Sequence, residues 1–188
     1  MECYRCGATL GRESFCPSCG TDVKVYKPFD EFLKYDFFSS IELHPNLFKQ
    51  YGCKQVGSNG ELLEANKVVE GMGILAALIA AKPNNEFIKE CLDYFGNRHF
   101  VNPDGSLYTD IINPGIMATL AVKYGFRYID KTQVLDNNMI ILDSSVFAGN
   151  AATLSKQSYS MHYCDGSWRE KTLVQKLKSF IRNYFLVK

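Results

Sequence analysis

Two short cysteine motifs near the N-terminus restrict what this chain can fold into more than any other feature. They are Cys3-Tyr4-Arg5-Cys6-Gly7 and Cys16-Pro17-Ser18-Cys19-Gly20. In a CxxCG turn, the glycine lets the backbone bend so that amide N–H groups point at the thiolate sulfur atoms. Two such turns bring four thiolates into a closed tetrahedron, so Cys3, Cys6, Cys16 and Cys19 are expected to hold structural Zn²⁺.

A unit this small has almost no apolar core, and zinc would supply most of its folding free energy, on the order of 10 kcal/mol or more. We expect a zinc ribbon at residues 1–22 and a second domain at 23–188, where the composition changes to apolar and aromatic segments. A closed four-cysteine site has no open coordination position, which favours structural zinc over catalysis or thiol redox chemistry. Zinc ribbons also bind protein partners, and the sequence does not identify one for this ribbon.

The remaining cysteines, Cys53, Cys91 and Cys164, are odd in number, which favours a reducing compartment over a disulfide framework. The N-terminus lacks the apolar region of a signal peptide, and the longest apolar stretch, 73–81, is too short to cross a bilayer. We therefore expect a cytoplasmic protein without a transmembrane segment.

The charges of the chain are nearly balanced. Its 188 residues include 21 basic and 20 acidic side chains, and the net charge is +1. This balance creates no overall field that would recruit nucleic acid, and the ribbon offers only Arg5, Arg12 and Tyr4 as basic and aromatic contacts. No nucleic-acid partner is expected.

Capping residues and apolar spacing predict two helices. Asn84 or Asn85 caps a helix that runs to Tyr94 and ends at Gly96, and Asn113-Pro114 begins another that ends near Gly125. The two apolar stripes are Phe87, Ile88, Cys91, Leu92 and Phe95, and Ile116, Met117, Leu120, Ala121 and Tyr124. A third stripe over 169–185 predicts a C-terminal helix packed on the core.

Strands are expected between these helices. The pattern predicts strands at 36–43, 126–129, 139–142 and 158–163, a loop at 52–60, and a strand, turn and short helix over 23–33. The run ILAALIAA at 74–81 fits either a buried strand or a short buried helix. These elements together predict an α/β fold with a mixed sheet.

Four blocks, taken in order, carry a resemblance. They are TDVKVYKPFDEFLKYDFFSSIE at 21–42, the block 73–95 ending in EFIKECLDYF, INPGIMATLAVKYGF at 112–126, and SMHYCDGSWREK at 160–171. In this order they resemble the C-terminal half of bacterial capsular-polysaccharide glycosyltransferases, related to glycosyltransferase family 32, whose sugar-binding region carries a DxD motif. The resemblance implies a partial GT-A-like domain that transfers a sugar from a nucleotide-sugar in surface-polysaccharide assembly.

The resemblance also assigns site residues. In such enzymes Mn²⁺ or Mg²⁺ neutralises the diphosphate that leaves as the sugar is transferred. By resemblance, Asp22 matches the second DxD carboxylate, His162 matches a histidine near the same metal, and Ser167 and Trp168, after Gly166, contact the donor diphosphate. The implied acceptor is a glycan or a lipid-linked glycan, which would place the protein at the inner face of the membrane.

The sequence departs from this pattern in two ways. Gly20 stands where the first DxD carboxylate is expected, and its neighbour Cys19 is a predicted zinc ligand. A nucleotide-binding βαβ half, which takes ~30 residues or more, is expected ahead of the motif, but only Met1 and Glu2 precede Cys3. We therefore expect a truncated transferase that is weakly active or inactive. The alternative is a non-catalytic zinc-ribbon interaction module.

Other reactive side chains have no supporting pattern in the sequence. His44 and His99 lack partners at metal-ligand spacing, and Cys53, Cys91 and Cys164 lack a nearby base. We interpret all five as structural or incidental.

Overall fold

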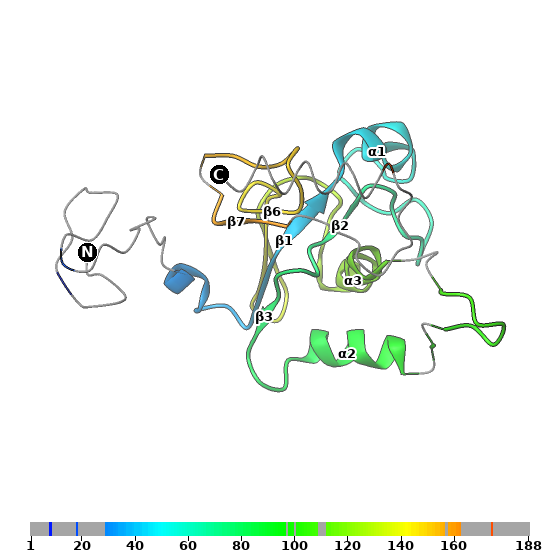
Figure 1. The fold of residues 1–188 in the computed structure, drawn as a ribbon, viewed down its shortest axis with the longest axis horizontal. Coiled ribbons are helices and arrows are strands. Elements are labelled where there is room, and N and C mark those ends of the chain that lie inside the picture. The colour runs from blue at the N-terminus through cyan, green and yellow to red at the C-terminus, as the bar shows by residue number, and fades with distance from the viewer. Residues whose placement is uncertain are drawn as a thin grey trace. The chain divides into compact units, whose positions relative to one another are not determined.

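The computed structural model describes residues 29–96, 98–99, 101–108, 112–156 and 158–162, together with the single positions Ala8, Ser18 and Val174. The chain divides into two compact units, Met1–Lys34 and Tyr35–Lys188. In the first unit the described element is a 3-10 helix, η1 (Phe29–Phe32). The elements described below belong to the second unit (Figure 1). Apart from these single positions, the predicted zinc ribbon and C-terminal helix lie outside the described residues.

A mixed sheet forms the centre of the second unit. Its strand order is β2 (Met72–Ile74), β1 (Phe37–Leu43), β5 (Met139–Leu142) and β4 (Gln133–Leu135), and β3 (Ala80–Ala81) pairs with the start of β1. β1 and β5 are parallel, with Ser40 beside Leu142, and the other pairs in this sheet are antiparallel. The mixed sheet and its helices confirm the α/β class.

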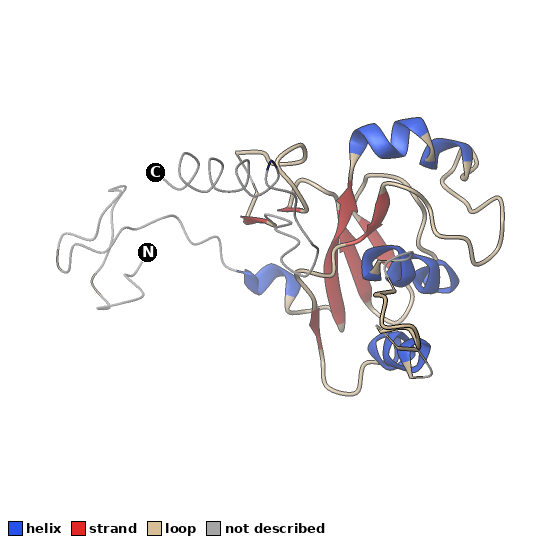
Figure 2. Ribbon diagram, turned by 45° about the vertical axis from the view of Figure 1, so that its right-hand side comes forward, coloured by secondary structure: helices blue, strands red, loops and turns tan. Residues whose placement is uncertain are grey.

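The two faces of β1 are covered differently, because successive side chains of a strand point to opposite faces. On one face, the ring of Phe37 packs edge-on against Phe87 at a centroid distance of 4.9 Å. On the other, Phe38 stacks with Phe147 at 6.3 Å. Figure 2 shows helices on one side of the sheet and two short strands on the other, β6 (Phe147–Ala148) and β7 (Ser160–Met161), which are parallel.

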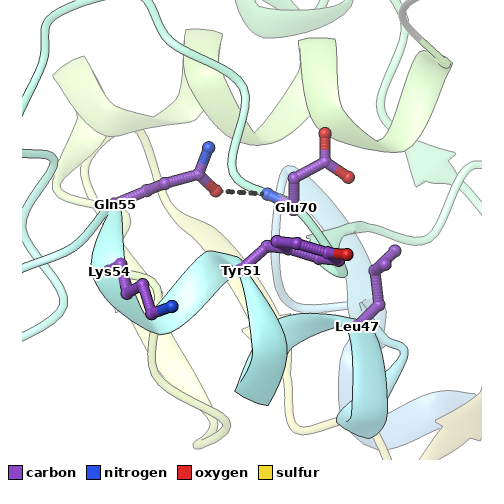
Figure 3. Close-up of a pocket in the computed structure, with 5 residues that line it drawn as sticks. All are labelled: Leu47, Tyr51, Lys54, Gln55 and Glu70. Carbon is purple, nitrogen blue, oxygen red and sulfur yellow. Dashed lines mark hydrogen bonds between the residues drawn. The ribbon is translucent and has the colours of Figure 1, made fainter.

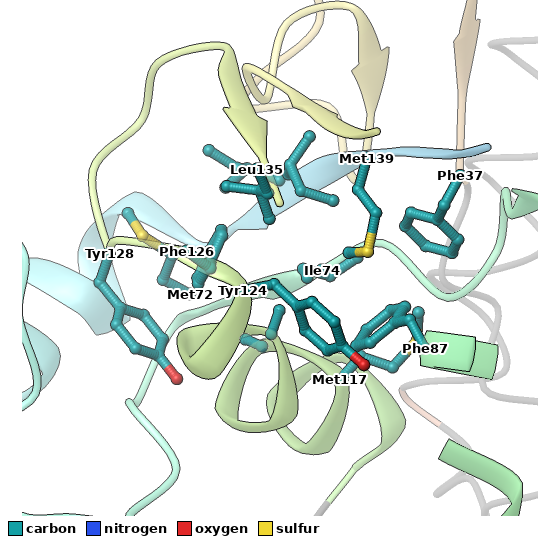
Figure 4. Packing of buried hydrophobic residues seen from close by; sticks show 14 of the residues in the cluster. Phe37, Met72, Ile74, Phe87, Met117, Tyr124, Phe126, Tyr128, Leu135 and Met139 are labelled. Atoms are coloured by element: carbon teal, nitrogen blue, oxygen red, sulfur yellow. The ribbon is translucent and has the colours of Figure 1, made fainter. Parts of the chain in front are cut away.

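The main core lies on the helical side of the sheet (Figure 4). α2 (Glu86–Phe95) begins as predicted, because the Asn85 side chain accepts a hydrogen bond from the amide of Ile88 at 3.1 Å. Phe87 and Cys91 are buried. The rest of the predicted apolar stripe is not fully buried, since Leu92 is 66% exposed and Phe95 is 41% exposed.

The second predicted helix is also present, with a tighter last turn. α3 (Asn113–Ala121) continues into the 3-10 helix η3 (Val122–Tyr124), and Gly125 then takes a left-handed conformation with φ 95° that favours glycine. Met117 and Ala121 are fully buried, whereas Leu120 is half-buried. The Asn113 side chain does not cap the helix, since the cap position falls on Ile112.

Several sequence expectations were wrong or incomplete. Residues 126–129 do not form a strand, and the amide of Tyr128 instead donates to Gly60 O at 2.8 Å. The apolar run at 74–81 contains the end of β2 and all of β3, with a turn between them. The predicted strand at 158–163 is shortened to β7 among its described residues, and the predicted loop at 52–60 begins with the 3-10 helix η2 (Gly52–Lys54). α1 (Pro45–Gln50), β4 and β6 were not predicted.

Candidate functional site

The candidate site lies at the edge of the sheet where the parallel strands β1 and β5 both end. β1 ends at Leu43 and is followed by His44, and β5 ends at Leu142 and is followed by Asp143. The carboxyl ends of neighbouring parallel strands meet at one edge, and open α/β sheets generally bind ligands there. The polar side chains at this edge therefore decide what the site can do.

On the β5 side, the carboxylates are already used to hold turns together. Asp143 accepts hydrogen bonds from Ser145 Oγ at 2.6 Å and Thr132 Oγ1 at 3.0 Å. Asp130 accepts two bonds of 2.8 Å from the amide and hydroxyl of Ser144. Burial raises the pKa of Asp143, but the hydrogen bonds from Ser145 and Thr132 together outweigh it and leave this pKa lowered. These two carboxylates have a structural role.

On the β1 side, Glu42 differs from these two carboxylates because it is buried on a strand and does not hold a turn together. It is only 7% exposed, and it lies on the same face of β1 as Phe38 and Ser40. The chain after β6 covers it closely, since a Cβ atom added at Gly149 would lie 3.0 Å from Glu42 Cγ. A carboxylate buried to this extent needs a charged or hydrogen-bonding partner.

His44 is that partner. Its Nε2 lies 3.3 Å from Glu42 Oε1, and its side chain is 42% exposed. The hydrogen bond to Glu42 raises the pKa of His44 and outweighs the opposing effect of burial. The pair thus presents a half-exposed imidazole to solvent on a buried carboxylate, an arrangement that favours the protonated form of the ring.

Asn150 fixes the other side of the imidazole. Its Nδ2 donates to Leu43 O at 2.7 Å and lies 3.5 Å from His44 Nδ1. In the neutral imidazole, Nδ1 accepts from this amide while Nε2–H donates to Glu42. The segment after β6 therefore both covers Glu42 and orients His44.

His162 directly follows β7, the strand that pairs with β6. Its amide donates to Ala148 O at 2.7 Å, directly before Gly149, and its side chain is exposed. The structure thus brings the backbone of His162 to the segment that covers Glu42. The other predicted site residues lie outside the described residues, namely Cys3, Cys6, Cys16, Cys19, Asp22, Gly166, Ser167 and Trp168.

The donor chemistry at this edge suits a hard divalent cation only in part. Carboxylate oxygen suits Mn²⁺ or Mg²⁺, and imidazole suits several transition metals. Across the part of the chain that the structure describes, no three His, Cys, Asp or Glu side chains gather as a metal-ligand group. Glu42, His44 and His162 therefore do not form a metal centre by themselves.

Sequence reasoning missed Glu42, His44 and Asn150. His44 has no partner at metal-ligand spacing, so its sequence context indicates only a structural or incidental role. A signal was nevertheless present: Glu42 and His44 are two positions apart at the end of a predicted strand, and alternate residues share one face. Asn150 could not be found in this way, because it lies 107 positions from Leu43 in the sequence.

A second polar cluster connects α2 with η3. Glu90 Oε1 accepts from Tyr124 Oη at 2.9 Å and also contacts Lys123 Nζ. Burial, followed by the hydrogen bond to Glu90, raises the pKa of Tyr124. Glu90 Oε2 is buried without a hydrogen-bond partner among the described residues. The bonds that are made connect two elements of the core, which favours a structural role.

The described cysteines show no sign of a nucleophile. Cys91 is buried, and burial raises the pKa of its thiol to about 11. Cys53 is exposed, and its Sγ lies 3.1 Å from Lys49 O. Reactive cysteines need a lowered pKa, so the interpretation of Cys91 as structural is supported.

Comparison with protein-family models, with curated proteins and with solved structures finds no match to this chain. Among the described residues, no helix is both long and apolar enough to cross a membrane. Fold and site together define an α/β protein with a mixed sheet and, at the carboxyl edge of its parallel strands, a buried glutamate paired with a half-exposed histidine.

Proposed function

We propose that this chain is a glycosyltransferase-like protein that takes part in the assembly of surface polysaccharides, with a nucleotide-sugar as donor and a divalent cation as cofactor. The ordered sequence blocks described above motivate this proposal. The observation that carries it is the Glu42–His44 pair, which lies at the carboxyl edge of a parallel strand pair, next to the segment that hydrogen-bonds the backbone of His162.

The proposed roles follow from the chemistry of each side chain. Asp22 and His162 would hold Mn²⁺ or Mg²⁺, which neutralises the leaving diphosphate, and Ser167 and Trp168, after Gly166, would donate hydrogen bonds to that diphosphate. Glu42 keeps the His44 imidazole oriented, so that the exposed edge of the ring can pack against a bound substrate. Glu42 is therefore a positioning residue.

Titration calorimetry of the full chain with uridine and guanosine diphosphates, with and without Mn²⁺, tests this proposal. We expect weak binding that requires Mn²⁺, because Gly20 replaces one carboxylate of the motif. Asp22→Ala and His162→Ala should each abolish it. His99→Ala is the matched control, since His99 is another exposed histidine.

Two results would contradict the transferase proposal. One is the absence of nucleotide binding in a folded chain, and the other is binding that does not change when Mn²⁺ is omitted or His162 is replaced. Either result would favour the alternative, a zinc-dependent interaction module without catalytic activity.

The proposal also includes structural zinc at Cys3, Cys6, Cys16 and Cys19. Elemental analysis of the purified chain should find about one zinc per chain, and Cys16→Ser should lose it. Cys53→Ser is the control, because Cys53 is exposed and outside the motifs. An unchanged zinc content in Cys16→Ser would exclude this site.

A further inference from the structure

A surface pocket of about 430 Å³ lies beside the helices that follow β1 (Figure 3). Its lining residues are Leu47 and Tyr51 from the α1 turn, Lys54 and Gln55 from the end of η2, and Glu70 from the loop before β2. Ligand pockets typically have volumes of roughly 300 to 1,000 Å³. This pocket is separate from the residues of the Glu42–His44 pair.

The walls of the pocket are held in place by close backbone packing. A Cβ atom added at Gly52 would lie 2.2 Å from Glu70 O, so glycine is required for the helical turn to approach the loop. Gln55 Oε1 accepts a hydrogen bond of 2.8 Å from the amide of Glu70, which joins the two walls (Figure 3). The walls are therefore preorganised, which lowers the entropic cost of binding.

The aromatic ring in this pocket is unusually accessible. Tyr51 is 49% exposed and Leu47 is 38% exposed. Gln50 Nε2 donates to Tyr51 Oη at 2.7 Å, so the ring has a preferred orientation. An exposed and oriented aromatic ring gives a flat apolar surface on which another ring can stack.

The polar groups around the ring are mixed in kind. Lys54 supplies N–H donors, Glu70 supplies acceptor oxygens, and the Gln55 amide has donors that the described residues leave unused. The charges of Lys54 and Glu70 are opposite, so the pocket has no net preference for an anion or a cation. A neutral ligand with several hydroxyl groups and an apolar ring face matches this set.

We propose that this pocket is a saccharide-binding subsite for a neutral oligosaccharide. The apolar C–H face of a sugar ring stacks on Tyr51, while Lys54, Gln55 and Glu70 exchange hydrogen bonds with its hydroxyl groups. The inference deepens the proposed function, on which it rests, by assigning a binding surface to the glycan acceptor. Binding of the saccharide needs neither nucleotide nor Mn²⁺, so it can be measured separately.

Saturation-transfer difference NMR on the full chain, without nucleotide or Mn²⁺, tests the subsite. The neutral probes are maltotriose, lactose and N,N′-diacetylchitobiose, and a galacturonic acid trisaccharide and glucose 1-phosphate are the charged probes. We expect at least one neutral probe to bind with transfer to its ring C–H protons, and the charged probes to bind more weakly.

Variants identify the pocket as the place of binding. Tyr51→Ala should weaken binding about tenfold or more, and Tyr51→Phe should retain most of it because the ring remains. Glu70→Gln should weaken binding less than Tyr51→Ala. Tyr94→Ala is the matched control, as Tyr94 lies on α2 and is not one of the lining residues.

The subsite is excluded if no neutral probe binds, if the charged probes bind better, or if Tyr51→Ala binds as well as the unaltered chain. Saccharide binding without nucleotide binding would keep the subsite and contradict the transferase proposal. Nucleotide binding without saccharide binding would exclude the subsite and keep the transferase proposal.

Discussion

The two faces of β1 are built from the same seven-residue strand but serve different purposes. The face that carries Phe37 and Ile41, here called the apolar face, packs into the core with α2 and α3, and both residues are fully buried. Ser39 lies between them on this face, and its buried hydroxyl donates to the carbonyl oxygens of Leu75 and Leu78. The opposite face carries Phe38, Ser40 and Glu42, and there every polar side chain has a partner. One strand thus supplies the core on one side and the site on the other.

This difference shows where the fold can hold polar groups. Ser40 Oγ bonds the carbonyl oxygen of Asp143 at 2.6 Å, just beyond the end of β5, and Glu42 lies one step nearer the edge. Polarity on this face therefore increases toward the carboxyl end of β1, where the chain after β6 supplies further partners. Buried polar groups are retained where such partners exist.

The largest effect is expected on the apolar face. Phe37→Ala should lower the free energy of unfolding by about 3 to 5 kcal/mol, since the ring is fully buried and packs on Phe87. Urea denaturation followed by circular dichroism measures this loss. A loss below about 1 kcal/mol would mean that the two faces do not differ as described.

A pair of substitutions on α3 sharpens the same point. Met117→Ala should lower the free energy of unfolding by about 2 to 5 kcal/mol, because Met117 is fully buried. Leu120→Ala should lower it clearly less, because Leu120 is only half-buried. The apolar stripe in the sequence, taken alone, predicts equal losses for the two substitutions. Equal melting shifts for the two variants would contradict the burial seen in the structure.

On the polar face, Gly149→Ala tests how closely Glu42 is covered. The added methyl group would lie 3.0 Å from Glu42 Cγ, so we expect a loss of about 1 to 3 kcal/mol and a disturbed His44 signal in NMR spectra. Adding Glu42→Ala should recover part of this loss, because the clashing side chain is removed. Strictly additive effects would show that Gly149 and Glu42 do not interact.

The smallest effect concerns the pH dependence of the Glu42–His44 pair. The pKa of His44 is raised above 6.5 in the folded protein, so the pair stabilises the fold fully below the unfolded value and loses this effect as pH rises through the folded value. An NMR titration of the imidazole should show a pKa that falls in Glu42→Gln. Glu64→Gln, at an exposed ion pair, is the control and should leave it unchanged.

Local signals account for the elements that the sequence predicted well. The caps and glycines around α2 and α3 act within a few residues, and the apolar runs that became β1 and β5 are long enough to be recognised. The strand predicted at 126–129 was wrong. Phe126 and Tyr128 are buried as alternate residues of a strand would be, yet the amide of Tyr128 donates to Gly60 O in a loop. Burial of alternate residues does not require a strand partner.

The sequence by itself determined the α/β class, the start of α2, the start of α3 to within one residue, and the strand β1 that carries Glu42 and precedes His44. Only the tertiary structure decided that β5 lies parallel to β1, that Gly149 covers Glu42, and that Asn150 reaches Leu43 and His44. The physical reason is that side-chain periodicity specifies which face of an element is buried, but not which distant segment buries it. That choice depends on packing and hydrogen bonding across the whole chain.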